Sequence, residues 1–179
     1  NFWNENGLWP ANSSECASYR GGQVYTFCPT VSYNTMIAPL NGYTARGVVW
    51  YQGESDNDLT HASAYVERFN AFIEYLRGTH NVINKKIPVF VTELATIYQA
   101  PKGFNGTWYH MEVGLIRSFM GQLPSAMHNA YVAASGDVWK DTAFYNNLHP
   151  GCKYQQAERL ADIAEVVILK GGSNFTAVH

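Results

Sequence analysis

The sequence lacks an excess of charge of either sign. Its 179 residues include 12 Lys and Arg against 14 Asp and Glu, which gives a formal net charge of −2 at pH 7. Proteins that bind nucleic acid or an anionic membrane surface through charge carry a marked excess of Lys and Arg. The composition therefore favours neither nucleic acid nor a membrane as partner.

Long apolar runs are missing as well. No stretch approaches the roughly 20 apolar residues that a transmembrane helix needs, and the first residues do not have the pattern of a signal peptide. The chain begins at Asn1 without an initiator Met, so we expect it to be either processed or incomplete. We find no internal repeat and no low-complexity tract.

Cysteine is scarce, and its spacing fits no zinc-binding pattern. The three cysteines are Cys16, Cys28 and Cys152. One disulfide with a free thiol and three reduced thiols both remain open. Sequons of the Asn-x-Ser/Thr type begin at Asn12, Asn105 and Asn174. They permit a secreted protein without requiring one.

What the sequence does contain is an alternation of strand and helix patterns. Short apolar runs typical of strands cover Val48–Tyr51, Ile87–Leu94 and Ala130–Ala134. Apolar residues spaced three or four apart, as on one face of a helix, run over Ala62–Leu76, Tyr109–Leu123 and Ala157–Ile168. The length fits one domain over 1–179 with a real core, preceded by an irregular lead-in over 1–32.

This alternation predicts an α/β domain with a parallel sheet and right-handed crossovers. The unbroken apolar run Val48–Tyr51 predicts a strand covered on both faces. A short helix is predicted within Tyr33–Leu40, and Pro150 suits the first turn of the last helix. Three strands are few, because such sheets usually have about five. We therefore expect the remaining strands to lie outside this chain.

Polar residues follow the first predicted strand directly, in the order Gln52, Gly53, Glu54, Ser55 and Asp56. In open α/β sheets, ligands bind at the carboxyl ends of the strands. This turn is therefore a candidate functional site, although a solvated surface turn would have a similar composition.

A second polar loop runs over 137–149 and ends in His149, directly before the last predicted helix. A histidine at this edge of the sheet, near carboxylates, is a candidate general base. We interpret the other five histidines as surface or hydrogen-bonded residues, which is the commoner role.

Three segments together resemble a known family. They are Met36–Leu40, Arg46–Asp56 with its Trp-Tyr-Gln-Gly-Glu-Ser run, and His149-Pro150 before a terminal helix. They are similar to the sialate O-acetylesterase and acetylxylan esterase branch of the SGNH hydrolases, over roughly 33–169. The resemblance implies a flavodoxin-like three-layer α/β/α fold, incomplete in this chain. It also implies serine-dependent removal of acetyl groups from sugars such as sialic acid or xylan, without metal or cofactor, in a secreted, periplasmic or lysosomal protein.

The resemblance also implies roles for individual residues. His149 corresponds to the family's general base, and Glu54 to an acid that orients the histidine. Gln52 would bind the oxyanion, with Ser55 as the alternative. Asn146 stands where the family usually has Asp, three residues before the histidine, so we assign it to substrate binding.

An amide at that position cannot supply the negative charge that stabilises an imidazolium. Glu54, Asp137 or Asp141 would have to supply it instead, and Glu54 is our choice.

The family's nucleophile block, Gly-Gln-Ser-Asn-Met or similar, should precede Tyr33 and is absent. Its nearest match, Gly171–Phe175, follows the last helix, where a Gly-Gly pair is more typical of a helix cap. The remaining candidates lack the strand-turn-helix setting of an activated serine; they are Ser13, Ser14, Ser32 and Ser55. We expect a separate amino-terminal fragment or chain to supply the serine. The alternative is a carbohydrate-binding or regulatory module that kept the fold and lost the nucleophile.

Overall fold

The computed structural model describes residues 36–40, 42–54, 56, 58–79, 86–95, 106–138 and 153–170. In helix α4, which covers Gly106–Met120, side chains are described from residue 113 onward. The strands are β1 (Val48–Trp50), β2 (Val89–Thr92) and β3 (Ala130–Ala133). The helices are α2 (Leu59–Ser63), α3 (Tyr65–Thr79), α4 (Gly106–Met120), α5 (Leu123–Ala126) and α6 (Lys153–Ala164). A 3-10 turn, η3, covers Ala38–Leu40, and a π-helical turn, η4, extends α6 over Glu165–Leu169.

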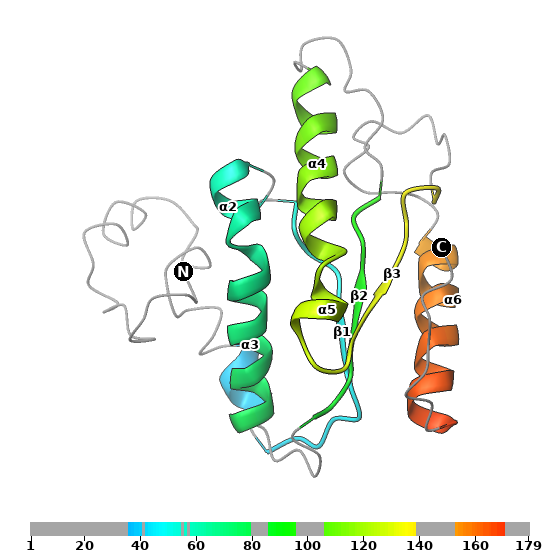
Figure 1. Ribbon diagram of the computed structural model, residues 1–179. Helices are drawn as coiled ribbons and strands as arrows, with labels where there is room; N and C mark the ends of the chain where they lie inside the picture. The colour runs from blue at the N-terminus through cyan, green and yellow to red at the C-terminus, as the bar shows by residue number, and fades with distance from the viewer. Residues whose placement is uncertain are drawn as a thin grey trace, which may run out of the picture.

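The three strands form one parallel sheet in the order β1, β2, β3. Val49 lies opposite Phe90, which in turn lies opposite Tyr131. Because the strands are parallel, their carboxyl ends share one edge of the sheet, at the top of Figure 1. The predicted alternation of strands and helices, and the α/β class, are therefore confirmed.

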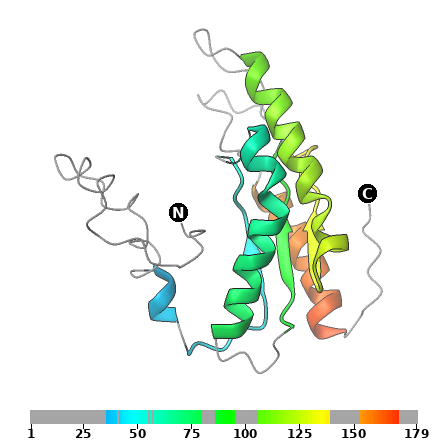
Figure 2. The same cartoon turned by 60° about the vertical axis from the view of Figure 1, so that its left-hand side comes forward.

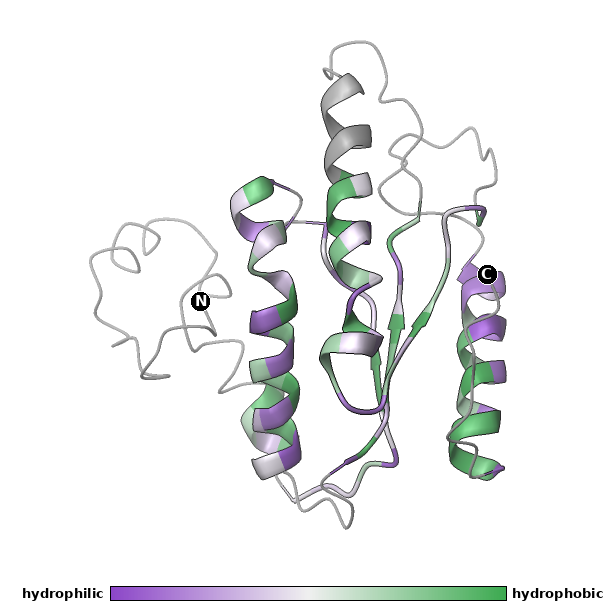
Figure 3. Cartoon of the chain, viewed as in Figure 1, coloured by the Kyte–Doolittle hydropathy of each residue, from purple (hydrophilic) through white to green (hydrophobic). Residues whose placement is uncertain are grey.

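Helices cover the sheet from both sides (Figures 1 and 2). Helices α2 to α5 pack on one face, where Phe69, Ile73, Ile116 and Met120 form the centre of the larger core. Helix α6 packs on the other face, where Ile163 meets residues of β2 and β3. Figure 3 shows hydrophobic residues concentrated on the strands and on the later part of α6. The expected helix, sheet, helix layering is present.

The first predicted helix is in fact two helices. Asp58 caps the start of α2 by accepting from the backbone N–H of His61, and the backbone turns at Ala64 before α3 begins. Ala62 and Tyr65, on either side of this break, are both buried on the same core. Apolar spacing could not reveal the break, because the buried face continues through it.

The burial of β1 also differs from the prediction. Its apolar run predicts cover on both faces, but the side chain of Val49 is 68% exposed. Val48 and Trp50 pack on the larger core, whereas α6 on the other face lies over β2 and β3. An apolar run shows that a strand can be buried on both faces, and the position of the covering helix decides whether it is.

The buried face of α6 agrees only in part with the predicted one, since Leu160, Ala164 and Ile168 pack on the smaller core as predicted. Ala157 and Ala161 are exposed, while Gln156 and Ile163 are buried. Alanine favours helices wherever it stands, so it does not mark which face is buried. The lead-in over 1–32 and Pro150 lie outside the described residues. Within Tyr33–Leu40, the described residues 36–40 are all helical, and the last three form the turn η3.

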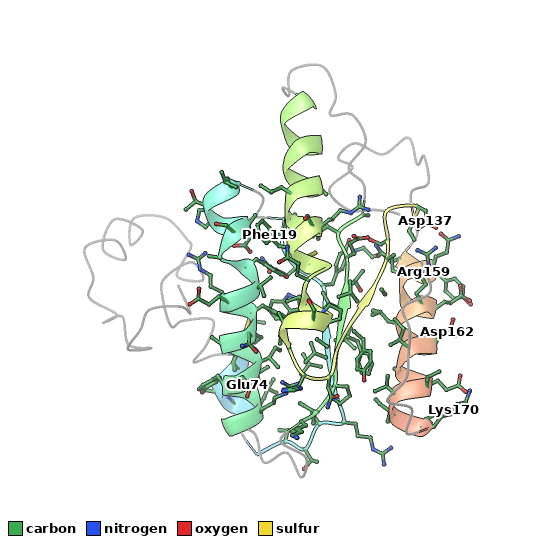
Figure 4. The ribbon with its side chains drawn as sticks, viewed as in Figure 1. Glu74, Phe119, Asp137, Arg159, Asp162 and Lys170 are labelled. Atoms are coloured by element: carbon green, nitrogen blue, oxygen red, sulfur yellow. The ribbon has the colours of Figure 1, made fainter. Side chains whose placement is uncertain are left out.

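One buried arginine fixes the opposite edge of the sheet. Arg77, near the end of α3, is only 4% exposed, and its Nη2 donates to the carbonyls of Ile87 and His128 at 2.8 Å each. These residues precede β2 and β3, so Arg77 holds the entries of both strands. Its Nη1 contacts Glu74, which is labelled on α3 in Figure 4 and is 59% exposed.

We expect Arg77→Met to lower the free energy of unfolding by about 2–3 kcal/mol, because two carbonyls lose a charged donor in a buried setting. Chemical denaturation followed by circular dichroism measures this. The control is Glu74→Gln, which removes the exposed partner of Arg77 but keeps its bonds to the two carbonyls, and which should cost less than about 1 kcal/mol. Equal losses for the two variants would contradict the anchoring role of Arg77.

Candidate active site

The polar turn after β1 is a closed structure. Gln52 Nε2 donates to Asp56 Oδ2 at 2.7 Å, and the backbone N–H of Asp56 donates to the carbonyl of Gly53 at 2.9 Å. Side chain and backbone thus close the same turn, which orients the amide of Gln52 at the carboxyl edge of the sheet.

Gly53 allows this turn to pack directly on the core. Its φ is +143°, a region that side chains disfavour, and a Cβ here would lie 2.7 Å from Met120 Cε and 3.4 Å from Leu94 Cδ1. The close approach to α4 requires glycine. It also fixes how far Gln52 and Glu54 project from the end of the strand.

Tyr65 connects the turn to the core. Its hydroxyl accepts from Trp50 Nε1 at 3.2 Å and donates to the backbone carbonyl of Gln52 at 3.1 Å. Burial raises the pKa of this phenol, and the nearby carboxylates of Asp56 and Glu54 raise it further. The hydroxyl therefore keeps its proton at neutral pH and remains a donor to Gln52.

The start of α6 reaches the same turn from the other face of the sheet. Lys153 Nζ lies 5.6 Å from the centre of the Tyr51 ring. Burial raises the pKa of Tyr51, a hydrogen bond with Gln156 opposes this rise, and the Glu54 carboxylate adds to it. Tyr51 and the first turn of α6 therefore form one wall beside Gln52.

A second group of polar residues follows β2 and β3. Glu93, just after β2, pairs with Arg117 of α4 (Nε to Oε1, 3.3 Å) and accepts from the backbone N–H of Ser135 at 3.1 Å. The hydroxyl of Ser135, which is fully buried, donates to the carbonyl of Glu93. Glu93 is therefore an ion-pair partner at the carboxyl end of β2.

Asp137 is held by Arg159 of α6. Two guanidinium nitrogens reach the two carboxylate oxygens at 2.6 Å each, which lowers the pKa of Asp137 to about 2. The pair is partly solvated, so its contribution to stability is small. That contribution is present above the ordinary carboxyl pKa and is lost as the pH falls towards 2.

The described residues include some of the predicted site residues and not others. Gln52 and Glu54 both stand in the turn at the carboxyl edge of the sheet, as expected from their position after β1. Ser55, Asn146 and His149 lie outside the described residues. The convergence of Glu54 with His149 therefore stays a prediction. The same holds for the three cysteines, the sequon asparagines and the Gly171–Phe175 segment.

Sequence reasoning missed several polar contacts around the site. His61 Nδ1 meets the carboxylate of Asp58, and Arg117 reaches Glu93 across 24 positions of sequence. The first had a signal, since an Asp before an amphipathic helix is a typical cap. The second had none, because only the packing of α4 against β2 brings the two residues together.

Neither a metal centre nor a membrane span is found in the part of the chain that the structure describes. There, no three His, Cys, Asp or Glu side chains are grouped so that they could hold a metal ion. Among the same residues, no helix is both long and apolar enough to cross a bilayer.

One family model matches most of the chain. Residues 16–155 match the carbohydrate esterase family described as sialic acid-specific acetylesterase. This span is most of the chain and contains the turn after β1, β2, β3 and the polar loop. The chain belongs to this family.

Individual relatives agree with this assignment. The chain is 29% identical to the sialate O-acetylesterase of Mus musculus over 156 residues, which is 82% of this chain and 28% of that protein. It is also 29% identical to the sialate O-acetylesterase of Homo sapiens over 140 residues, covering 73% of this chain and 26% of that one.

A solved structure gives the same result. A carbohydrate acetylesterase from Xanthomonas citri superposes with a TM-score of 0.64 at 29% identity, covering 82% of this chain and 31% of that one. The predicted SGNH-type α/β fold is thereby confirmed. The chain spans under a third of the length of each of these relatives.

We expect Gly53→Ala to lower the free energy of unfolding by about 1–3 kcal/mol, because the new Cβ meets Met120 and the backbone conformation is strained. Thermal and urea unfolding measure the change. Gly114→Ala is the matched control: a Cβ there has no neighbour within 4 Å and lies within α4. This control should stabilise by up to about 1 kcal/mol. Tolerance of alanine at Gly53 would contradict the close packing of the turn.

Proposed function

We propose that the protein hydrolyses acetyl esters on carbohydrates, with His149 as general base and with a serine from polypeptide outside residues 1–179. The main support is the match of residues 16–155 to a carbohydrate esterase family, a span that includes the polar turn after β1. Sialic acid and xylan are the candidate acetylated carriers. Such substrates agree with a protein that is secreted, periplasmic or lysosomal.

Chain length supports the meeting of His149 with the turn. His149 stands four residues before Lys153, whose ammonium lies against the Tyr51 ring. Four residues span at most about 14 Å even when fully extended. This limit allows His149 to lie near Gln52 and Glu54, which follow Tyr51 in the sequence, and so supports their proposed meeting.

The geometry of Gln52 suits oxyanion binding. A glutamine amide has two N–H donors, and one of them is used by Asp56. This hydrogen bond fixes the plane of the amide, and among the described residues the second N–H has no partner, so it could donate to a developing negative charge. A preoriented donor of this kind lowers the barrier by about 3–4 kcal/mol.

The reaction would proceed in two steps. The serine hydroxyl attacks the acetyl carbonyl while His149 takes its proton, and the sugar leaves with that proton as a free hydroxyl. Water, deprotonated by His149, then releases acetate and restores the serine. Glu54 would hold the imidazole in the required tautomer. Asp56 is less suited to that role because it already accepts from Gln52.

The open side of β1 supports an added segment that brings the serine. Among the described residues, β1 pairs with β2 alone, and Val49 is 68% exposed on the face that α6 does not reach. A further strand beside β1 would pair with its free edge, and a helix connected to that strand could cover Val49 on the face of the sheet. The carboxyl end of that strand would lie next to Gln52, where a nucleophile is needed. This partner is a separate fragment, a separate chain or a further part of the same protein.

We expect His149→Ala to reduce hydrolysis of an acetylated model ester by about 10³-fold or more in protein that includes the serine. The control is His61→Ala, because His61 is exposed and serves the cap of α2; it should change the rate by less than about 2-fold. Circular dichroism checks that both variants fold. Activity kept in His149→Ala would refute the assignment of the base.

The second candidate is a carbohydrate-binding or regulatory module without catalysis. It is favoured by the absence of a nucleophile block of the Gly-Gln-Ser-Asn-Met type before Tyr33. A fluorophosphonate probe separates the two candidates, because it labels only activated serines. Intact mass and peptide mapping should locate the label on a serine outside residues 1–179. Absence of labelling, together with retained sugar binding, would favour the module.

A further inference from the structure

The turn over residues 134–138 follows β3 and leads into segment 139–152, which includes His149. The residues that flank this segment on both sides are described by the structure. Helix α6 begins at Lys153. Contacts between the turn and α6 therefore decide how far apart the two ends of 139–152 lie.

Arg159 of α6 donates three hydrogen bonds to this turn. Its Nη1 donates to the carbonyl of Ala134 at 2.7 Å and to Asp137 Oδ1 at 2.6 Å, and its Nη2 donates to Asp137 Oδ2 at 2.6 Å. This is the two-pronged geometry that arginine forms with carboxylates, with a backbone carbonyl added. Figure 4 shows Asp137, on the turn after β3, next to Arg159 of α6.

The opposite side of the turn is held as well. Arg117 of α4 pairs with Glu93, and Glu93 accepts from the backbone N–H of Ser135. A Cβ on Gly136 would lie 2.2 Å from Arg117 Nη2, so the guanidinium packs directly on the turn. The turn thus sits between a helix on each face of the sheet, with Ser135 and Val138 fully buried.

We propose that the Arg159–Asp137 pair is a positioning device for the general base, because it ties the start of segment 139–152 to the helix that ends it. This inference rests on the proposed function. Arg159 is 36% exposed and Asp137 68%, and pairs this exposed add little to stability. A displacement of about 1 Å in a catalytic group, in contrast, can cost about 100-fold in rate.

The test compares kinetics and stability in protein that includes the serine. Asp137→Asn and Arg159→Gln should each lower kcat for a neutral acetyl ester by about 10- to 100-fold. KM should change by less than about 3-fold, since substrate contacts are untouched. The exchanged pair, Asp137→Arg with Arg159→Asp, should recover part of kcat. A merely structural role would not give this split between kcat and KM.

Glu165→Gln is the matched control, because it breaks an exposed ion pair with Lys170 at the far end of the same helical segment (Figure 4). It should leave kcat within about 2-fold. Single variants that keep full kcat, or an exchanged pair no better than either single variant, would overturn the positioning role.

Hydrogen exchange separates this inference from the proposed function. In the single variants, amides within 139–152 should exchange at least several-fold faster than in the wild type, whereas those of β2 should not change. If the wild-type protein hydrolyses no acetyl ester, the proposed function fails, and faster exchange still supports the tie. Unchanged exchange in 139–152 would overturn the tie whatever the activity.

Discussion

The hydrogen bonds of the Tyr65 hydroxyl join the core of this protein to its candidate site. The hydroxyl accepts from Trp50 inside the sheet and donates to the backbone of Gln52 in the turn. Burial keeps the phenol protonated, so the link persists over the physiological pH range. Gly53 completes the arrangement because it lets the turn rest on Met120. The polar groups at the mouth of β1 are therefore held by side chains that belong to the larger core.

Much of the fold could be predicted from the sequence because its elements have distinct periods. The apolar strands and the helices with three- and four-residue spacing were found with the correct order and class. The break at Ala64 was missed because buried residues continue on one face across it. The exposure of Val49 was missed because a strand's own residues do not say where a distant helix will pack. The spacing of apolar residues along the chain predicts strands and helices, whereas the packing of distant helices decides which of their faces are buried.

The residues of the candidate site, like the fold, could be predicted from the sequence only in part. Gln52 and Glu54 were located by a general property of parallel sheets, that polar residues after a strand lie at its ligand-binding edge. The two arginines that hold the turn after β3 could not be located, since each pairs with a carboxylate more than 20 positions away. Charged residues on amphipathic helices are normally interpreted as a solvated face. Only coordinates distinguish Arg117 and Arg159 from such residues.

The unpartnered side of β1 bears on the behaviour of the chain by itself. Within the described residues, this strand is at an edge of the sheet and exposes an apolar valine at its centre. An edge strand presents unpaired backbone N–H and C=O groups to which a strand of another chain can add, and Val49 carries no charge that would oppose such pairing. Preparations of residues 1–179 would then be prone to self-association that depends on concentration. The dependence of association on protein concentration would thus report whether the free edge of β1 is paired with another strand.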